Sequence, residues 1–465
     1  MDFDLIVVGS GPGGYHAAIR GAQLDLKVAV VEKGAVGGVC LNVGCIPTKA
    51  LLHVGSELRQ AKEAKEFGID FGQPKVDLGA VEEWKQKVVG KQTNGVQMLF
   101  KGNKIELIEG EGRFVSANEI EVAGKKYSAK AFVVATGSSP ASIPGFELDG
   151  DRIIDSTGAL NIGEEVPKRF VVIGAGAIGL EFADVYSSLG SEVTVVEMMD
   201  QIAAAADADA SKELRKALEK RGIRILTSTK VLGQKKTKKG TEVEVEDKDG
   251  KKETLMADRV LVAVGRRPNG KNLGLEQAGV EVDERGFVKV FNDHMQTSVP
   301  NIYAIGDVAR APLLAHKAMK EGLVAAEHAA GKPTAYDTVV PSVIYTSPEL
   351  ASVGMTEAEA KEAGYELRIG KFPLMASGRA STLGVDSGMI KLIGDAETDL
   401  LLGFHMVGPN AGDIVAEAAL AIEMGATLED IALTQHPHPT ISEGVMEAAE
   451  HAHGRAIHIA NRRRR

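Results

Sequence analysis

The sequence has few cysteines and few aromatic residues. Its 465 residues include two cysteines, one tryptophan and 5% aromatic residues in total. Nucleic-acid binding usually depends on a positive surface and on aromatic stacking, and a chain with a formal net charge of −10 offers little of either. Two cysteines are also too few for a cysteine-rich zinc site, so we expect no bound metal.

Long apolar runs and a basic leader are absent as well. No segment approaches the roughly 20 apolar residues that a membrane span needs. Residues 1–4 lead directly into the apolar run Leu5–Val8 without a basic stretch, so we expect no signal peptide and a cytoplasmic protein. Thiols stay reduced in the cytoplasm, and two cysteines so close in sequence therefore suit redox chemistry better than a structural bridge. The tail Arg462–Arg465 is expected to be a solvated end, because like charges repel.

One pattern occurs twice in the chain. The apolar run Leu5–Val8 precedes the glycine-rich segment Gly9–Gly14, and the apolar run Phe170–Ile173 precedes Gly174–Gly179. In both copies a helical stretch and a second strand follow. That strand ends in a glutamate, Glu32 in the first copy and Glu197 in the second, at the same distance from the first glycine. A glycine pattern in this context predicts a dinucleotide-binding unit, so the chain is expected to hold two.

Each glycine of the pattern has its own expected role. The first permits a tight turn, the second lets the backbone approach a pyrophosphate at the start of a helix, and the third lets that helix pack on the strand. These positions are Gly9, Gly11 and Gly14 in the first copy and Gly174, Gly176 and Gly179 in the second. Glu32 and Glu197 are expected to hydrogen-bond ribose hydroxyls. Because Glu197 would repel a 2′-phosphate and no arginine follows it, the second unit is expected to prefer NAD over NADP.

The two cysteines, Cys40 and Cys45, lie in the segment Gly37–Lys49. At this separation on a regular helix their Cα atoms would be roughly 8–9 Å apart, whereas a disulfide needs less than about 7 Å. The helix must therefore be distorted if the pair closes, and Gly44 with nearby Pro47 offers a means. Strain makes such a disulfide easier to reduce. A helix that begins near Pro47 would favour a thiolate at Cys45.

These motifs resemble those of the flavin-dependent disulfide reductases, the family that includes dihydrolipoamide dehydrogenases and glutathione reductases. The segments Ala135–Gly137 and Ala304–Asp307 share the resemblance, which covers essentially the whole chain. It implies FAD in the first dinucleotide-binding unit and NAD in the second. Cys40 resembles the thiol that attacks the substrate, and Cys45 resembles the thiol that touches the flavin.

The resemblance also implies individual cofactor contacts. Lys49 resembles a lysine near the reactive part of the flavin, paired with Glu181. Asp307 matches an aspartate on the ribitol of FAD, Ala315 lies where a backbone flavin contact is expected, and Gly112 lies near the adenine end. The remaining contacts carried over are Thr136, Gly137, Val231 and Gly265.

A histidine and a glutamate near the C-terminus, His438 and Glu443, form a candidate acid–base pair. Oxidation of a dithiol needs a base that takes a proton and later returns it, and a carboxylate can fix the tautomer of such an imidazole. Spacing alone supports this pair weakly, because the chain has 11 histidines. We expect His316, His405 and His436 to be packing or surface residues.

The family resemblance strengthens that pair. The segment from His436 is similar to the family motif His-x-His-Pro-Thr-x-Ser-Glu, in which the second histidine is the acid–base and the glutamate orients it. These roles fall on His438 and Glu443. In the family the pair comes from the other subunit, which implies a homodimer. Pro437 departs from the alanine common at its position, which puts the orientation of His436 in doubt.

The order of the motifs predicts an α/β fold with two Rossmann-like dinucleotide-binding domains and a C-terminal α+β dimerisation domain. In the last part, helical stretches at Thr356–Ala363 and Gly412–Met424 alternate with short strands such as Met389–Ile393, and a helix is expected from Thr440. The predicted domains are 1–147 for FAD with the cysteine pair, 148–273 for NAD, 274–343 as a central domain completing the FAD site, and 344–465 as the interface domain.

Within the family, the chain is most similar to dihydrolipoamide dehydrogenases. The lack of further cysteines excludes relatives with a C-terminal cysteine pair. The lack of a preceding metal-binding domain counts against mercuric reductases, and glutathione reductases carry arginines after the second glycine motif. The expected activity is NAD-dependent oxidation of protein-bound dihydrolipoamide within a 2-oxo acid dehydrogenase complex. Expected partners are a lipoylated carrier and the basic peripheral-subunit-binding domain of an acyltransferase. The alternatives are an NADPH-dependent reductase of a soluble disulfide such as glutathione disulfide, and a non-catalytic flavoprotein scaffold.

Overall fold

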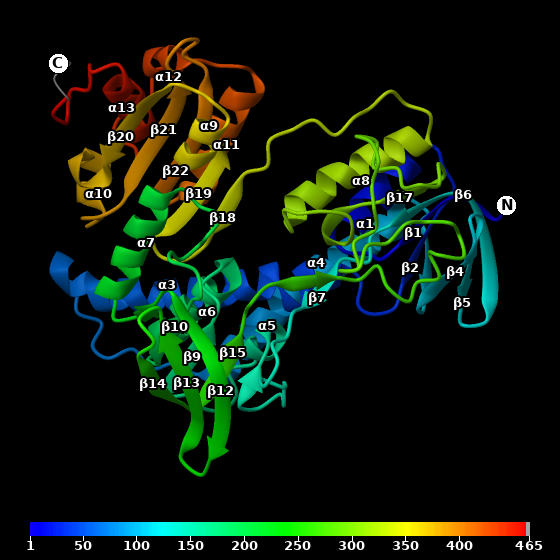
Figure 1. Cartoon of the computed structure of the whole chain (residues 1–465), viewed down its shortest axis with the longest axis horizontal. Coiled ribbons are helices and arrows are strands. Elements are labelled where there is room, and N and C mark those ends of the chain that lie inside the picture. Colours follow the sequence, from blue (N-terminus) through cyan, green and yellow to red (C-terminus); the bar gives the residue numbers. More distant parts are fainter. Residues whose placement is uncertain (462–465) are drawn as a thin grey trace. The chain divides into compact units, whose positions relative to one another are not determined.

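The structure, a computed structural model, describes residues 1–461, and the predicted solvated tail Arg462–Arg465 lies outside them. The described residues form two compact units, each assembled from separate stretches of the chain. Unit 1 comprises Met1–Leu51, Asp77–Ala141 and Gly265–Asp337, and unit 2 comprises Leu52–Val76, Ser142–Val264 and the chain from Thr338 onward. Figure 1 labels their helices and strands. The domain boundaries expected from the sequence stay predictions.

Unit 1 is built on a sheet with a parallel centre. The strand order is β3 (Glu106–Glu109), β2 (Val28–Glu32), β1 (Phe3–Val8), β6 (Lys125–Val134), β5 (Glu119–Val122) and β4 (Gly112–Ser116), and β17 (Ile302–Ala304) also pairs with β6. Strands β3, β2, β1, β6 and β17 are parallel to their neighbours, whereas β4, β5 and the start of β6 pair antiparallel. The parallel part contains the first predicted strand–turn–helix motif.

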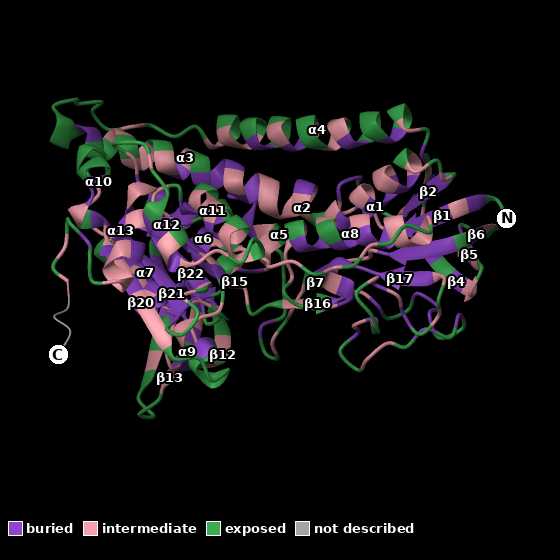
Figure 2. Cartoon of the chain, turned by 90° about the horizontal axis from the view of Figure 1, so that it is seen from above, coloured by how far each residue is buried: buried purple, intermediate pink, exposed green. Residues whose placement is uncertain are grey.

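The central strand β1 is buried on both faces. Leu5 and Val7 belong to one buried cluster, and Ile6 and Val8 belong to another. Strands of parallel sheets are commonly covered on both sides, which explains why β1 is continuously apolar instead of alternating. In Figure 2 strand β17 is coloured as buried, as is the end of β6, whereas the long helix α4 (Leu78–Gly102) has a largely exposed outer face.

Helices and short segments surround the sheet of unit 1. They are α1 (Pro12–Gln23), α2 (Gly38–Val43), the first part of α3 (Cys45–Glu63), α4, the 3₁₀ turn η2 (Gly306–Val308) and α8 (Ala315–Ala329), with a small ribbon of β7 (Ser138–Pro140) and β16 (Arg266–Pro268). Helix α3 crosses from unit 1 to unit 2 after Leu51.

Unit 2 contains the second dinucleotide-binding motif. A parallel sheet has the order β11 (Arg224–Leu226), β10 (Glu192–Val196), β9 (Arg169–Ile173), β15 (Arg259–Val262) and β8 (Ile153–Ile154). Its helices are α5 (Ser156–Ala159), α6 (Ala177–Ser188) and α7 (Ala208–Lys220), and an antiparallel sheet follows with β12 (Thr229–Thr237), β13 (Gly240–Asp247) and β14 (Lys252–Ala257). The turn η1 (Ala64–Phe67) follows α3.

The rest of unit 2 is an α+β arrangement. An antiparallel sheet has the order β18 (Ser342–Ile344), β19 (Glu349–Gly354), β22 (Leu401–Gly408), β21 (Met389–Asp395) and β20 (Leu367–Pro373). Its helical segments are α9 (Glu357–Glu362), η3 (Leu374–Ala376), α10 (Gly378–Thr382), α11 (Ala411–Glu423), α12 (Leu428–Leu433) and α13 (Glu443–Ala452). The predicted fold class is confirmed, and α9, α11 and β21 confirm the two helices and the strand expected at 356–363, 412–424 and 389–393.

One predicted helix start is wrong. Helix α13 begins at Glu443, not at Thr440. The backbone N–H of Thr440 donates to the Glu443 carboxylate at 2.7 Å, and the N–H of Glu443 donates to the Thr440 hydroxyl at 3.3 Å. Thr440 therefore forms a reciprocally bonded turn ahead of the helix, and this turn fixes the Glu443 side chain.

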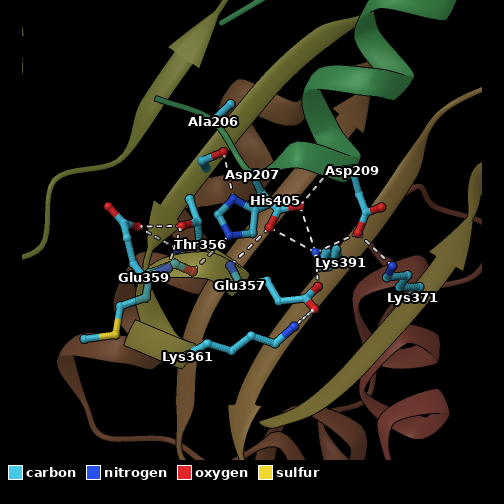
Figure 3. A network of polar contacts seen from close by, with 12 residues as sticks. Ala206, Asp207, Asp209, Thr356, Glu357, Glu359, Lys361, Lys371, Lys391 and His405 are labelled. Carbon is cyan, nitrogen blue, oxygen red and sulfur yellow. Dashed lines mark hydrogen bonds and ion pairs between the residues drawn. The ribbon is translucent and has the colours of Figure 1, made fainter. Parts of the chain in front are cut away.

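A buried lysine, Lys391, ties α7 and α9 to the C-terminal sheet of unit 2 (Figure 3). Its side chain is 1% exposed, and its ammonium lies 2.8 Å from Asp207, 2.7 Å from Asp209 and 2.7 Å from Glu357. Asp207 and Asp209 come from the start of α7 and Glu357 comes from α9. His405 is fully buried in the same region, as expected for a packing residue, with its ring nitrogens 3.0 Å from the Ser352 hydroxyl and 3.0 Å from the Met355 carbonyl.

Replacing Lys391 by methionine is predicted to destabilise the protein. The change leaves Asp207, which is 2% exposed, without its ammonium partner, and breaking a buried pair in this way costs about 3–5 kcal/mol in the free energy of unfolding. The matched control is Lys361→Met, because Lys361 also pairs with Glu357 but is 62% exposed. The control is expected to cost less than about 1 kcal/mol. Equal losses in urea-induced unfolding would contradict this account.

The same cluster predicts a loss of stability in acid. Burial opposes ionisation of Asp209, but hydrogen bonds from Lys371 and Lys391 hold its pKa at about 2. Hydrogen bonds from Lys361 and Lys391 lower the pKa of Glu357. An unfolded aspartate has a pKa of about 3.9, so this stabilisation is present above that pH and is lost as the pH falls toward 2. Unfolding midpoints measured at falling pH should drop less steeply over this range for Lys391→Met than for the natural protein.

Candidate active site

The segment with the two cysteines is a helix broken at one residue. Helix α2 ends at Val43, Gly44 leaves the helical conformation with φ −145° and ψ −114°, and α3 begins at Cys45. Cys40 and Cys45 are both thiols, and the Cys40 side chain hydrogen-bonds to Cys45. The expected distortion is therefore present and brings the pair together. Helix α3 begins close to Pro47, as expected. Because Pro47 has no N–H to donate to the carbonyl of Val43, it favours an interruption of the helix at this point.

The two cysteines differ in their electrostatic surroundings. The hydrogen bond to Cys45 and burial raise the pKa of the Cys40 thiol, and Lys49 acts in the opposite direction. Cys45 lies at the N-terminus of α3, where the helix dipole favours an anion. The surroundings of Cys40 thus disfavour a thiolate, whereas the helix N-terminus favours a thiolate at Cys45.

Residues that the sequence interpretation missed surround this pair. Burial is the main cause that raises the pKa of the Tyr15 phenol, and the charges of Cys40 and Cys45 add to it. Tyr15 is therefore electrostatically coupled to the cysteine pair. The Asn42 side chain donates to the Val36 carbonyl at 3.0 Å and to the Gly38 carbonyl at 2.9 Å. The Thr48 hydroxyl donates to the Gly44 carbonyl at 2.6 Å. These bonds hold both sides of the helix break.

The first glycine motif forms a turn that has no room for side chains. Gly9 has φ +102°, and a Cβ there would lie 2.5 Å from the Ala135 carbonyl oxygen. A Cβ on Gly14 would lie 2.0 Å from the Gly9 oxygen. At Gly11, which precedes α1, nothing lies within 4 Å of a Cβ position. The first and third glycines are thus required by packing, whereas the second leaves the helix N-terminus open.

The second glycine motif repeats this arrangement in unit 2. Gly174 has φ +104°, and a Cβ there would lie 2.5 Å from the Ala263 oxygen. A Cβ on Gly179 would lie 1.9 Å from the Gly174 oxygen, and the Gly176 position is again open. The agreement extends to single atoms, which supports the interpretation of the chain as two copies of one nucleotide-binding device.

The glutamate at the end of each second strand binds its own glycine turn. Glu32 accepts from the Ser10 N–H at 2.8 Å and from the Gly34 N–H at 2.8 Å. Glu197 accepts from the Ala175 N–H at 2.7 Å and from the Met199 N–H at 2.9 Å. Both carboxylates are thereby fixed beside the open helix N-termini. Their expected ribose contacts stay predictions.

Asp307 lies in η2, directly after β17 in unit 1. The Ser138 hydroxyl donates to Asp307 at 2.5 Å, and Arg266 Nε donates to the same hydroxyl at 2.7 Å. Close by in sequence, the Thr136 hydroxyl donates to the Asn269 carbonyl at 2.9 Å, and Asn269 N–H donates to the Gly137 carbonyl at 2.9 Å. The segment after β6 is therefore bonded both to the residues at β16 and, through Ser138, to Asp307.

The other expected cofactor residues occupy varied positions. Gly112 is buried at the start of β4, Ala315 is the first residue of α8, Gly265 has φ +117°, and Lys49 is half-buried in α3. The partly buried Val231 side chain packs against a hydrophobic cluster of unit 2, and its contact with a cofactor stays a prediction. Glu181 is buried and accepts from the Tyr345 N–H at 3.0 Å. Its pairing with Lys49 stays a prediction.

His438 and Glu443 form a pair in unit 2. His438 Nδ1 donates to Glu443 at 2.9 Å, and the imidazole is 80% exposed. Burial acts against ionisation of Glu443, but the Thr440 N–H and His438 lower its pKa. The bond fixes the His438 tautomer and leaves Nε2 as the basic nitrogen. His436 is bound by Glu417 at 2.8 Å and is nearly buried, as expected for a packing residue.

Residues 3–322 match the Pyridine nucleotide-disulphide oxidoreductase family. The chain belongs to this family. Residues 340–449 match its dimerisation domain, which supports a homodimer. The dihydrolipoyl dehydrogenase of Thermus scotoductus is 58% identical and is matched over 99% of both chains. That of Geobacillus stearothermophilus is 47% identical over 99% of this chain and 98% of its own, and the mitochondrial enzyme of Pisum sativum is 45% identical over 98% and 92%.

Solved structures agree with the assignment to the disulphide oxidoreductases. LpdA from Mycobacterium tuberculosis has a TM-score of 0.88 at 26% identity, covering 96% of this chain and 99% of its own. The HOCl-induced flavoprotein disulfide reductase RclA from Escherichia coli has a TM-score of 0.85 at 25% identity with the same coverage. Within residues 1–461 of this oxidoreductase, no helix has both the length and the apolar character to cross a membrane.

In this disulphide oxidoreductase, substitutions at the crowded glycine Gly174 and at the open glycine Gly176 are predicted to have different effects. Gly174→Ala places a Cβ against the Ala263 oxygen at positive φ and should lower the unfolding free energy by about 1–3 kcal/mol. Gly176→Ala meets no atom, so it should cost less than about 1 kcal/mol while weakening NADH binding, because the methyl group occupies the open helix N-terminus. Urea unfolding and NADH fluorescence measure both effects. Unchanged NADH binding by Gly176→Ala would contradict the assignment of that position.

Proposed function

We propose that the chain oxidises the dihydrolipoyl group of a carrier protein to the lipoyl disulfide, with reduction of NAD⁺ to NADH. The observation that carries the proposal is the contact between the Cys40 and Cys45 thiols at the helix break, in the same unit as the first glycine motif. Relatives at 45–58% identity over nearly the whole chain bear the name dihydrolipoyl dehydrogenase. The family assignment and the redox pair together support this activity.

Unit 1 offers a site that fits FAD. The open N-terminus of α1 at Gly11 suits a pyrophosphate, and the fixed Glu32 carboxylate suits a ribose hydroxyl. Asp307, Lys49, Thr136, Gly137, Ala315 and Gly112 would complete the FAD contacts. When bound, FAD supplies the two-electron chemistry that links the cysteine pair to NAD⁺. In unit 2, Gly176 and Glu197 would hold NAD in the corresponding way.

The cysteine pair performs the exchange with the substrate. A substrate thiolate attacks Sγ of Cys40 in the oxidised pair, so that a new S–S bond forms and the Cys40–Cys45 bond breaks. The second substrate thiolate then attacks the substrate sulfur bound to Cys40 and releases the cyclic disulfide. Two electrons have passed from the substrate to the protein, and Cys40 and Cys45 are left reduced. The helix N-terminus stabilises the thiolate on Cys45.

His438 serves as the base of this exchange. The Glu443 carboxylate holds Nδ1–H, so Nε2 accepts the proton of the substrate thiol and returns a proton later. Exposure of the imidazole leaves Nε2 open to a group from outside its own unit. We assign the pair to the active site of the partner subunit in a homodimer, in line with the match to the dimerisation domain.

The remaining partners and the location follow from the same activity. A lipoylated carrier protein would supply the substrate, and the net charge of −10 suits the basic peripheral-subunit-binding domain of an acyltransferase. Such a complex would operate in the cytoplasm. Glu197 and the absence of a following arginine favour NAD over NADP, which makes the alternative reductase of glutathione disulfide the weaker candidate.

The proposal predicts NADH formation from dihydrolipoamide and NAD⁺, and its loss in three variants. Cys40→Ser and Cys45→Ser each remove one sulfur of the exchange and should abolish turnover. His438→Gln should lower kcat by about 10²–10⁴-fold, the usual contribution of a general base. The matched control is His436→Gln, because that imidazole is engaged by Glu417 and should leave turnover close to normal.

Two results would overturn the proposal. One is faster turnover with NADPH and glutathione disulfide than with NADH and lipoamide, which would favour the alternative reductase. The other is turnover that persists in Cys45→Ser, since a scaffold or a different electron path would then be required.

A further inference from the structure

Two charged side chains of α8, Lys317 and Glu321, are almost completely buried in unit 1. Lys317 is 2% exposed and Glu321 is 0% exposed, whereas such residues are rarely buried unless they are paired. They lie one helical turn apart, with Lys317 Nζ 3.3 Å from Glu321 Oε2. A buried ion pair is weak support for net stability, because desolvation offsets the attraction. A positional role therefore explains the pair better than a stabilising one.

Both side chains bind the turn that follows β17. Glu321 accepts from the Gly306 N–H at 2.7 Å and from Arg310 Nε at 3.0 Å. Lys317 Nζ donates to the Gly306 carbonyl at 3.2 Å and to the Arg310 carbonyl at 2.5 Å. The pair thus holds the beginning and the end of the segment Gly306–Arg310. Loss of either side chain would leave buried backbone groups of this segment unsatisfied.

This turn carries Asp307, the residue expected to contact the ribitol of FAD. Gly306 has φ +70°, a conformation that glycine adopts readily and that redirects the chain at the end of β17. Asp307 then accepts from the Ser138 hydroxyl at 2.5 Å. Lys317 and Glu321 hydrogen-bond Gly306 and Arg310, which flank Asp307, and the charge of Lys317 also interacts with the Asp307 carboxylate. The hydrogen bonds fix the backbone of the turn that carries Asp307.

Helix α8 packs so closely against α1 that the contact leaves no room for side chains at two glycines. A Cβ on Gly322 would lie 2.4 Å from the Gly13 oxygen, and a Cβ on Gly13 would lie 2.9 Å from the Ala318 oxygen. The N-terminus of α1 is the proposed pyrophosphate position. One helix thus contacts α1 through glycine and holds the Asp307 turn through two charged side chains.

We propose that Lys317 and Glu321 are positioning residues that set the separation between the two FAD subsites, the start of α1 and Asp307. The inference rests on the proposed FAD site in unit 1. Any ligand that spans both subsites gains affinity when their separation is fixed before it binds, because less ordering is needed on association. The buried pair supplies that fixed separation.

The test measures FAD binding to the full-length apoprotein by the change in FAD fluorescence. Glu321→Gln keeps the shape of the side chain and removes its charge, and Lys317→Met removes the ammonium. Each should raise the FAD dissociation constant about tenfold or more, as expected when a buried bond to a charged group is lost. The matched controls are the exposed Glu284→Gln and, on α8 itself, Lys320→Met. Both controls should stay within about twofold of the natural protein.

A double-mutant cycle with Asp307→Asn separates positioning from a general loss of stability. If Glu321 acts through Asp307, then Glu321→Gln should weaken FAD binding much less in the Asp307→Asn background than alone. Additive losses would overturn the inference, and so would natural FAD affinity in both Glu321→Gln and Lys317→Met. If Glu321→Gln yields no folded apoprotein, the double-mutant cycle with Asp307→Asn is carried out with Lys317→Met instead. That variant retains the two hydrogen bonds of Glu321.

Failure of the proposed function gives a different result, namely no NADH formation from dihydrolipoamide and NAD⁺, and it leaves the comparison of FAD affinities intact. If the proposed FAD site itself is wrong, the natural chain would not bind FAD. A natural chain that binds FAD, combined with variants that bind it equally well, contradicts only the positioning role of Lys317 and Glu321.

Discussion

The contact between the Cys40 and Cys45 thiols depends on a single break in a helix. In a continuous helix, residues at this spacing would have Cα atoms too far apart for a disulfide. The break at Gly44 removes that obstacle and also creates a new helix N-terminus at Cys45. One backbone feature therefore provides both the proximity and the local field that thiol–disulfide exchange needs. Asn42 and Thr48 hold the break from either side through bonds to backbone carbonyls.

The nucleotide-binding motifs show how a repeated sequence pattern becomes a repeated atomic arrangement. In both units the first and third glycines approach backbone oxygens too closely for any side chain, and the second leaves the helix N-terminus open. Glu32 and Glu197 also bind the turns of their own motifs. A carboxylate at the end of the second strand thus has two tasks, because it stabilises the turn and faces the proposed ribose position. The disulphide oxidoreductase combines two such devices with one cysteine pair.

Local patterns in the sequence were enough to predict much of the fold and part of the site. The strands before each glycine motif, the α+β character of the last part and the distortion between Cys40 and Cys45 all depend on residues close together in the chain. The start of α13 was missed because Thr440 and Glu443 bind each other and hold the intervening residues outside the helix. The partners of the buried charged residues could not be predicted from local sequence patterns. Lys391 meets Asp207 and Glu357 only after three distant segments fold together, and the partners of Lys317 include the turn after β17.

The most direct test of the central claim counts thiols before and after reaction with substrate. The protein is denatured without oxygen and its cysteines are alkylated, first as the oxidised chain and then after addition of dihydrolipoamide without NAD⁺. The account predicts that neither cysteine is labelled in the oxidised protein and that both of the chain's two cysteines are labelled after the substrate is added. Equal labelling in the two samples, accompanied by continued NADH formation, would show that electrons bypass Cys40 and Cys45 and would contradict the account.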